Sequence, residues 1–375
     1  MPTLRRKADH LRINTEYEPS SSIRSGFDKY RFVHNALPEI DLEKISIEMH
    51  FLGKQLAAPV LISCMTGGTH RAGDINRVLA RTAQRFGFAV GIGSGRALLE
   101  DMSLLPSFDV RNEAPDALLL ANLGAVQLNR GIGVRDCRRL VNLLRADALI
   151  LHLNALQEAL QPEGDTVFSG LLPKIAEVCR ALDVPVVVKE VGWGIAPDEA
   201  RRLLDCGVTA IDVAGAGGTS WSEVERHRAT GAYALAARQF RGWGIPTARC
   251  IIDTRRALPQ ATIIASGGIV DGIDIAKAIA LGANLAGIAR PFLLAADDGE
   301  ESAAEFARGL LLALRASMFA LGITTIEELR GTKRLVNDEG HMKEQPPNGC
   351  NDKISEFDEE HSRVCNPNPA DKVRN

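Results

Sequence analysis

The sequence predicts a (β/α)8 barrel, an α/β fold of eight parallel strands, from three observations. Eight short runs of apolar and β-branched residues recur along the 375-residue chain, and glycines or polar residues follow most of them. Helical patterns, with apolar residues at three- and four-residue steps, lie between most of the runs. Strands that are apolar along their whole length belong to a parallel sheet covered by helices on both faces. The runs span residues 58–63, 89–92, 117–121, 148–152, 185–189, 210–214, 262–265 and 285–288.

Helical periodicity supports this fold, although an open doubly wound sheet also alternates strands and helices. The number of strands favours the barrel over that alternative, because eight units complete a closed barrel. The stretch 215–256 is longer than a loop between a strand and a helix needs, and we expect an extended sixth loop with its own helix there. The clearest helical patterns span residues 75–86, 135–144, 171–182, 197–206 and 273–281.

Composition divides the chain into three parts. Residues 1–56 precede the first barrel strand, and we expect an arm followed by a short antiparallel segment, 45–51, that closes the bottom of the barrel. The barrel itself is expected to span 57–331. Residues 332–375 form a polar, acidic tail that almost lacks large apolar side chains after residue 337, and we predict that it is mostly disordered.

Composition and charge exclude several classes of protein. With 45% hydrophobic and 24% charged residues, the chain is expected to be globular. Lys and Arg number 44 against 47 Asp and Glu, so no basic excess indicates nucleic acid or a membrane surface as the partner. No apolar run approaches the roughly 20 residues that span a bilayer. A charged N-terminus without a secretory signal, and cysteines without metal-ligand spacing, predict a cytoplasmic protein with reduced thiols.

Clusters of glycine and polar residues follow the predicted strands. In a barrel of this kind, the loops after the carboxyl ends of the strands meet at one face and carry the binding and catalytic residues. We therefore expect the clusters to surround one site. They lie at 64–68, 91–96, 122–124, 152–158, 189–190, 215–221, 266–269 and 289–291.

The last two clusters predict a phosphate site. Gly267, Gly268 and Ile269 follow the seventh strand, and Ala289 and Arg290 follow the eighth. Together they would present backbone N–H groups, one cation and a helix N-terminus to a phosphate. Either loop alone could equally be a tight turn, but two adjacent loops favour phosphate binding.

Three side chains are suited to a flavin. Lys189 ends a run of valines, where a cation is costly unless it meets an anion or a polarised ring, such as the N1/O2 edge of a flavin. The alternative is a lysine whose charged end reaches the surface. Asn122 and Ser94 can hydrogen-bond the flavin ring or ribityl chain, although either could instead cap a helix. Taken singly, these two residues have little specificity.

Residues 152–158 place polar side chains directly after an apolar strand, without turn-forming residues that would explain them. Glu158 can bind Mg²⁺ together with a diphosphate, because hard cations take carboxylate and phosphate oxygens together. Gln157 has no useful pKa, but it can position or relay a proton beside a stronger acid or base. In the alternative interpretation, Glu158 lies on a solvated face and His152 is a core histidine.

The basic residues Arg6, Lys7 and His10 lie near the N-terminus, where charged residues are usually only a solvated end. They could instead close over a diphosphate, with Arg96 supplying a bidentate contact. Cys64 follows a strand but has no apparent histidine partner, so we do not expect it to act as a nucleophile.

In their order along the chain, these motifs resemble those of the type 2 isopentenyl diphosphate isomerases, from about residue 4 to 331. Members of that family are flavin- and Mg²⁺-dependent barrel enzymes of isoprenoid biosynthesis, which convert isopentenyl diphosphate to dimethylallyl diphosphate. The chain departs from the family at Cys64, where serine is frequent, and at Ala155, where proline is frequent. The shared motifs are RKADHLRI (6–13), MTGG (65–68), SGR (94–96), HLNALQE (152–158), KEVG (189–192), DVAGAGGTSW (212–221), ASGGI (265–269) and ARPF (289–292).

The resemblance implies a set of site residues. Gln157 would face the reacting alkene and Glu158 would bind Mg²⁺. FMN would contact Cys64, Met65, Thr66, Ser94, Asn122, Lys189, Thr219, Gly267, Gly268, Ile269, Ala289 and Arg290. The substrate would meet Arg6, Lys7, His10, Ser94, Arg96, His152, Asn154 and Gln157.

The resemblance also implies a reaction without net redox change. Reduced FMN would act as acid and base, adding a proton at the terminal alkene carbon and removing one at the allylic carbon. Lys189 would stabilise the anionic reduced ring, and Lys189 and Gln157 are the expected catalytic residues. NADPH would serve only to reduce the flavin. Because the family forms tetramers and octamers, a homotetramer or homo-octamer is expected.

Two other classes of protein remain alternatives. An FMN oxidoreductase, such as a 2-hydroxy-acid oxidase, needs a histidine base beside an arginine after the sixth or seventh strand, and the loop 215–221 has neither. A nucleotide dehydrogenase of the same barrel class would need a loop cysteine, and none is suitably placed. A non-catalytic flavin-binding protein would not need Gln157 and Glu158 together with the N-terminal cations.

Overall fold

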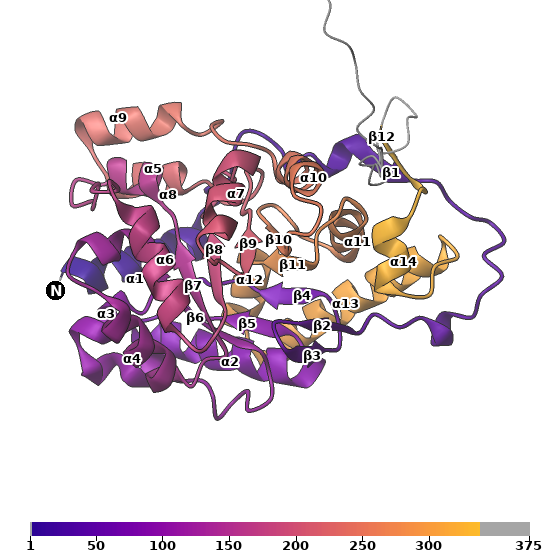
Figure 1. Cartoon of the computed structure of the whole chain (residues 1–375), viewed down its shortest axis with the longest axis horizontal. Helices are drawn as coiled ribbons and strands as arrows, with labels where there is room; N and C mark the ends of the chain where they lie inside the picture. Colours follow the sequence, from indigo (N-terminus) through magenta and orange to yellow (C-terminus); the bar gives the residue numbers. More distant parts are fainter. Residues whose placement is uncertain (1, 338–375) are drawn as a thin grey trace, which may run out of the picture. The chain divides into compact units, whose positions relative to one another are not determined.

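Eight parallel strands close into a barrel in the computed structural model, which describes residues 2–337 (Figure 1). The strands follow one another around the barrel in chain order, from β4 to β11, and β11 closes on β4 with Gly287 opposite Leu61. This closure confirms the predicted (β/α)8 barrel and rules out the open sheet. The barrel strands are β4 (Val60–Ile62), β5 (Ala89–Gly91), β6 (Leu119–Gly124), β7 (Ala148–His152), β8 (Val186–Lys189), β9 (Ala210–Asp212), β10 (Ile263–Ser266) and β11 (Leu285–Ile288).

Helices cover the outside of the barrel. At the start of α2 (His70–Phe86) the Thr69 side chain accepts a hydrogen bond from the backbone N–H of Ala72, and at its end Gly87 takes φ +64°, in the left-handed region. The other helices are α1 (Pro2–Glu16), α3 (Arg96–Glu100), α4 (Val134–Leu144), α5 (Ala155–Ala159), α6 (Leu171–Ala181), α7 (Pro197–Asp205), α8 (Trp221–Arg228), α9 (Gly231–Gln239), α10 (Thr247–Ala257), α11 (Gly272–Ala280), α12 (Arg290–Asp298), α13 (Glu300–Phe319) and α14 (Ile326–Gly331). Short 3-10 helices are η1 (Phe27–Lys29), η2 (Leu42–Lys44), η3 (Met102–Ser107) and η4 (Ala125–Asn129).

Two apolar cores form because side chains alternate along each barrel strand. In β4, Leu61 belongs to the core inside the barrel, whereas Val60 and Ile62 belong to the core between the strands and the helices. The antiparallel hairpin of β2 (Met49–Phe51) and β3 (Lys54–Leu56) contributes its buried apolar side chains to the inner core. The hairpin therefore packs against the residues that fill the barrel.

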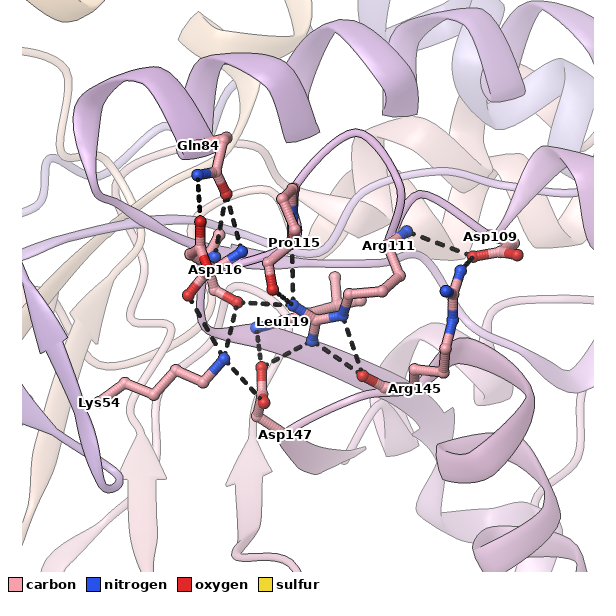
Figure 2. A network of polar contacts seen from close by, with 11 residues as sticks. Lys54, Gln84, Asp109, Arg111, Pro115, Asp116, Leu119, Arg145 and Asp147 are labelled. Atoms are coloured by element: carbon pink, nitrogen blue, oxygen red, sulfur yellow. Dashed lines mark hydrogen bonds and ion pairs between the residues drawn. The ribbon is translucent and has the colours of Figure 1, made fainter.

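A network of polar contacts lies at the amino ends of the strands, as Figure 2 shows. The guanidinium of Arg111 donates to the carbonyl oxygen of Arg145 and, at 2.7 Å, to the carboxylate of Asp147. Asp147 also accepts hydrogen bonds from Lys54 Nζ at 3.0 Å and from the backbone N–H of Leu119 at 2.9 Å. These contacts join the β2–β3 hairpin to the starts of β6 and β7, away from the loops at the carboxyl ends.

The segments outside the barrel differ from the expectations in detail. The N-terminal segment begins with the helix α1, which packs on α8 and α12. The sixth loop carries two additional helices, α8 and α9, where one was expected. β1 (Tyr30–Phe32) pairs antiparallel with β12 (Leu335–Asn337), so three residues near the start of the predicted tail form a strand. The rest of that tail, 338–375, lies outside the described residues.

Within residues 2–337, no helix combines the length and the apolar character that crossing a bilayer requires. The predicted cytoplasmic location stays a prediction.

Candidate active site

One cavity of about 410 Å³ lies at the carboxyl ends of the barrel strands, and every residue predicted to bind cofactor, substrate or metal lines it. Residues that follow all eight barrel strands form its walls, and α1 covers one side. The loops have thus brought together groups far apart in the sequence. The predicted residues in its lining are Arg6, Lys7, His10, Cys64, Met65, Thr66, Ser94, Arg96, Asn122, His152, Asn154, Gln157, Glu158, Lys189, Thr219, Gly267, Gly268, Ile269, Ala289 and Arg290.

The turn after β10 has the features of a phosphate site. Gly267 and Gly268 take φ +101° and +74°, and a Cβ on Gly268 would lie 2.6 Å from the carbonyl oxygen of Gly217. Within the described residues, the backbone N–H groups of Gly268 and Ile269 have no hydrogen-bond acceptor. Two unpaired donors beside the N-terminus of α12 fit the phosphate of FMN.

Arg290 has a different arrangement from the one expected. It lines the cavity, but its Nε donates to the carbonyl oxygen of Asn14 at 3.1 Å and its Nη2 to that of Tyr17 at 2.8 Å. The guanidinium therefore holds the C-terminal end of α1 against the barrel. The backbone N–H groups of Gly268 and Ile269 have no such partner among the described residues and stay available to a phosphate.

Lys189 is the last residue of β8 and is 9% exposed. Its Nζ donates to the carbonyl oxygen of Glu190 at 2.5 Å, and it pairs in register with His152 on one side and Asp212 on the other. The sequence-based alternative, a lysine that reaches the surface, is wrong because the side chain is buried at the cavity. A buried cation at this position fits an electron-rich flavin ring.

His152 is held as a neutral ring. Burial, followed by the positive charges of Lys189, Lys7 and Arg6, lowers its pKa to about 3. Its Nδ1 lies 2.9 Å from Asn122 Oδ1, which can only accept a hydrogen bond, so the neutral ring carries its proton on Nδ1.

The N-terminal cations lie in α1 and face the cavity from one side. Lys7 Nζ donates to the carbonyl oxygen of Ser94 at 2.8 Å, and Arg6 Nη1 donates to Gln161 Oε1 at 3.1 Å. Burial, together with the charge of Arg6, lowers the pKa of Lys7 to about 7. A cation that is buried beside another cation is stabilised by an anion, and this arrangement fits a diphosphate.

The predicted metal ligand lies in the short helix α5. Glu158 is 5% exposed; its Oε1 accepts from Asn154 Nδ2 at 2.8 Å and its Oε2 from the backbone N–H of Asp165 at 2.7 Å. The buried Oδ1 of Asn154 has no hydrogen-bond partner. Residues 2–337 contain no group of three or more His, Cys, Asp or Glu side chains able to hold an ion. A single carboxylate fits Mg²⁺ whose other ligands are phosphate oxygens and water.

Glu225, which the sequence analysis missed, organises the region around Gln157. Its side chain is 1% exposed, and Oε1 accepts from His10 Nε2 at 2.9 Å, Gln157 Nε2 at 3.0 Å and Gln161 Nε2 at 2.9 Å. Burial acts to raise the pKa of Glu225, but its hydrogen bond with His10 and the charge of Arg228 outweigh burial and lower it. The available signal was a glutamate within the predicted sixth loop, four residues after Trp221.

Two further side chains complete the cavity. Trp221 lines it, and its ring lies 5.0 Å from that of His10 in an edge-on arrangement. Burial raises the pKa of the Cys64 thiol to about 12, which agrees with the expectation that Cys64 is not a nucleophile.

Comparison with solved structures supports the fold. A lactate oxidase of Pediococcus acidilactici is 18% identical, with a TM-score of 0.61, and covers 88% of this chain and 86% of that one. A variant of flavocytochrome b2 with sulfite bound is 17% identical, with a TM-score of 0.64, and covers 93% and 90%. At these identities the likeness concerns the barrel alone.

Comparison with known sequences gives the family. The family described as FMN-dependent dehydrogenase matches residues 155–337. An isopentenyl-diphosphate delta-isomerase of Rickettsia bellii is 49% identical over 338 residues, 90% of this chain and 99% of the relative. Relatives of the same name from Nostoc sp. and Oceanobacillus iheyensis are each 48% identical, over 89% and 88% of this chain and 96% and 95% of their own lengths. The chain therefore belongs to the FMN-dependent, type 2 isopentenyl-diphosphate delta-isomerase family.

Proposed function

We propose that this chain converts isopentenyl diphosphate to dimethylallyl diphosphate, a step of isoprenoid biosynthesis, using reduced FMN and Mg²⁺. Membership of the isomerase family supports the reaction. The observation that carries the proposal is the combination, in one cavity, of a phosphate turn with Lys189, the cations of α1, and Gln157 beside Glu158. A flavin and a separate diphosphate each have suitable groups there.

Residues after several strands would hold FMN. The turn at Gly268 and Ile269 would bind its phosphate, and Lys189 would lie at the electron-rich side of its ring. When bound and reduced, FMN supplies the acid and base for the two proton transfers and an electron-rich face for positive charge. The remaining contacts would come from Cys64, Met65, Thr66, Ser94, Asn122, Thr219, Ala289 and Arg290.

A second set of cavity residues would bind the diphosphate. Arg6, Lys7 and Arg96 would neutralise its charge, with contacts from His10, His152 and Asn154. Glu158 would supply the protein ligand of Mg²⁺, the phosphate oxygens supplying others. Because the diphosphate does not react, its binding energy serves to orient the alkene.

Gln157 would face the reacting alkene. Its Nε2 donates to Glu225, which fixes the amide and leaves Oε1 with one long contact, 3.4 Å from Asn154 Nδ2. In this orientation Gln157 would position the alkene and the proton that moves. Two titratable groups adjoin it, because Glu225 contacts Gln157 directly and His10 contacts Glu225. Trp221 would wall the apolar part of the substrate.

A flavin oxidoreductase is the other candidate, because the FMN-dependent dehydrogenase family and the solved oxidases share the barrel. The histidines that line the cavity are His10, from α1, and His152, from β7. Among the lining residues that follow β9 and β10 there is no histidine to act as base. This arrangement disfavours oxidation of a hydroxy acid.

The test is an anaerobic assay. The purified protein is examined for bound flavin by absorbance, reduced with NADPH or dithionite, and given Mg²⁺ and isopentenyl diphosphate, while dimethylallyl diphosphate is followed by NMR. Product formed only with reduced flavin, without stoichiometric consumption of reductant, is expected. Bound flavin without product, and continuous NADPH oxidation when other acceptors are offered, would instead favour the oxidoreductase.

Other parts of the proposal concern partners. NADPH would act only as the reductant of the flavin, and the protein would be cytoplasmic. A homotetramer or homo-octamer is proposed, and the exposed side chains of Tyr233, Leu235 and Trp243 in and after α9 are candidates for subunit contacts. Light scattering of the purified protein would check the number of subunits.

A further inference from the structure

Asp165 has no part in the proposed reaction, and it does not line the cavity. Its carboxylate nevertheless contacts a residue that does. Oδ2 accepts hydrogen bonds from Arg96 Nη1 at 2.7 Å and from Gln127 Nε2 at 3.1 Å, while Oδ1 lies 2.9 Å from Arg130 Nε. Arg130 is not a lining residue, so it anchors the carboxylate through a contact outside the cavity lining.

Asp165 is held through its carboxylate by three side chains, Arg96, Gln127 and Arg130. Its side chain is 15% exposed, which reduces screening of the contact with Arg96. Arg96 Nε is occupied by Glu100 at 2.8 Å, so two carboxylates fix the guanidinium.

The backbone of the same residue holds the predicted metal ligand. The N–H of Asp165 donates to Glu158 Oε2 at 2.7 Å, while Asn154 donates to Oε1. The chain approaches this closely because the preceding residue is glycine; a Cβ on Gly164 would lie 1.8 Å from the carbonyl oxygen of Glu158. One residue therefore contacts both an arginine and a carboxylate that the proposed function assigns to the diphosphate and its Mg²⁺.

We infer that Asp165 is a positioning residue for the diphosphate and its metal: its carboxylate directs Arg96 and its backbone N–H directs Glu158 toward the same ligand. The inference rests on the proposed function. Partners of metal ligands typically affect metal affinity or activity by about 10- to 100-fold when they are removed. A bidentate arginine also needs a fixed orientation to match phosphate oxygens.

A competing interpretation gives Asp165 the opposite effect. A carboxylate on Arg96 could occupy the place of a phosphate and have to be displaced by the substrate. The anchoring of Oδ1 by Arg130, and the position of Asp165 outside the cavity lining, favour positioning over displacement. The two interpretations predict opposite changes in substrate affinity.

The test compares Asp165→Asn with the wild-type enzyme, both loaded with FMN. This substitution keeps the size of the side chain and the backbone N–H but removes the charge that Arg96 and Arg130 contact. Titration calorimetry measures binding of inorganic pyrophosphate in the presence of Mg²⁺, and steady-state kinetics give KM and kcat. We expect both the Kd of pyrophosphate and KM to rise on the order of 10-fold, with a smaller fall in kcat and unchanged flavin content.

Two further variants separate positioning from general loss of stability. Asp147→Asn is the matched control, because Asp147, like Asp165, contacts two cations and one neutral N–H donor, but at the amino ends of the strands (Figure 2). It should lower the melting temperature without changing KM. Arg130→Gln loosens Asp165 without touching a lining residue, and it should change KM in the same direction as Asp165→Asn but by less.

The outcomes distinguish this inference from the proposed function. Unchanged or tighter pyrophosphate binding by Asp165→Asn would overturn the positioning role, and tighter binding would indicate displacement. If the wild-type enzyme isomerises its substrate and Asp165→Asn matches its KM, only the inference fails. If the wild type binds pyrophosphate more tightly than the variant but forms no product, the proposed function fails and the positioning of a diphosphate stands.

Discussion

Replacing Glu225 with glutamine removes the charge that His10, Gln157 and Gln161 contact through one oxygen atom. Glutamine has nearly the same shape, so the cavity keeps its volume. Its amide offers only one carbonyl oxygen, and the NH₂ group that replaces Oε2 would face Arg228, which is itself a donor. The substitution thus changes the charge of the side chain at position 225 and the orientation of its hydrogen-bonding groups without creating a cavity.

The size of the effect follows from these contacts. Hydrogen bonds to a charged group contribute about 1.5–3 kcal/mol each, and a buried donor left without a partner costs about 1–3 kcal/mol. Arg228 retains Glu163 as a partner at 2.6 Å, so we expect a loss of about 1–3 kcal/mol in the free energy of unfolding. Gln157 keeps only a neutral amide oxygen as its anchor, shared with His10 and Gln161, and a displacement of Gln157 by about 1 Å can lower turnover about 100-fold.

The assay is the anaerobic isomerisation with reduced flavin, accompanied by thermal unfolding. Glu223→Gln is the matched control, because Glu223 lies in the same helix and is also buried, but its partner is Arg226, which does not line the cavity. We expect Glu225→Gln to lose kcat about 100-fold and Glu223→Gln to retain it. A Glu225→Gln enzyme within about threefold of wild type, or an equal loss in Glu223→Gln, would refute the anchoring of Gln157.

Three further predictions concern metal, cofactor and pH. Glu158→Gln should raise the Mg²⁺ requirement and sharply reduce turnover without loss of bound flavin; full activity at low Mg²⁺, measured by titration of the metal, would contradict the metal assignment. Lys189→Ala should weaken flavin retention during gel filtration, and a stoichiometrically yellow, active variant would contradict that role. Because the pKa of His152 is about 3 in the folded chain and 6.5 unfolded, the unfolded state binds more protons between these values, so stability falls as the pH is lowered from 6.5. Between pH 6.5 and pH 5, the melting temperature of the flavin-free protein should fall less for His152→Gln than for the wild type. Equal falls in the two proteins would show that His152 is not neutral.

Local patterns in the sequence predicted much of the site. The strand runs are continuous and apolar because both faces of each strand are buried, and the barrel places the residues after them at one face. The glycine turn at Gly268 and the polar segment that ends at Glu158 could therefore be located from the order of residues alone. Their lining of one cavity agrees with that reasoning.

Contacts between segments that are distant in the sequence could not be predicted from local patterns. Arg6 contacts Gln161 across 155 positions, and His10 contacts Glu225 across 215. The N-terminal cations were recognised, but the helix that presents them was not, because its position depends on packing against α8 and α12. Arg290 lines the cavity, but nothing in the sequence indicated that its guanidinium also holds the end of α1.

The sequence by itself determined the barrel and the residues that follow its strands, because hydrophobic periodicity and glycine turns are local properties of the chain. Only the tertiary structure decided which buried charges share a partner. Glu225 and Asp165 have no local signature, since a glutamate in a helix and an aspartate in a loop are ordinary surface residues until the fold buries the first and partly buries the second. Their importance comes from burial beside donors supplied by other segments, where each unpaired charge would be costly.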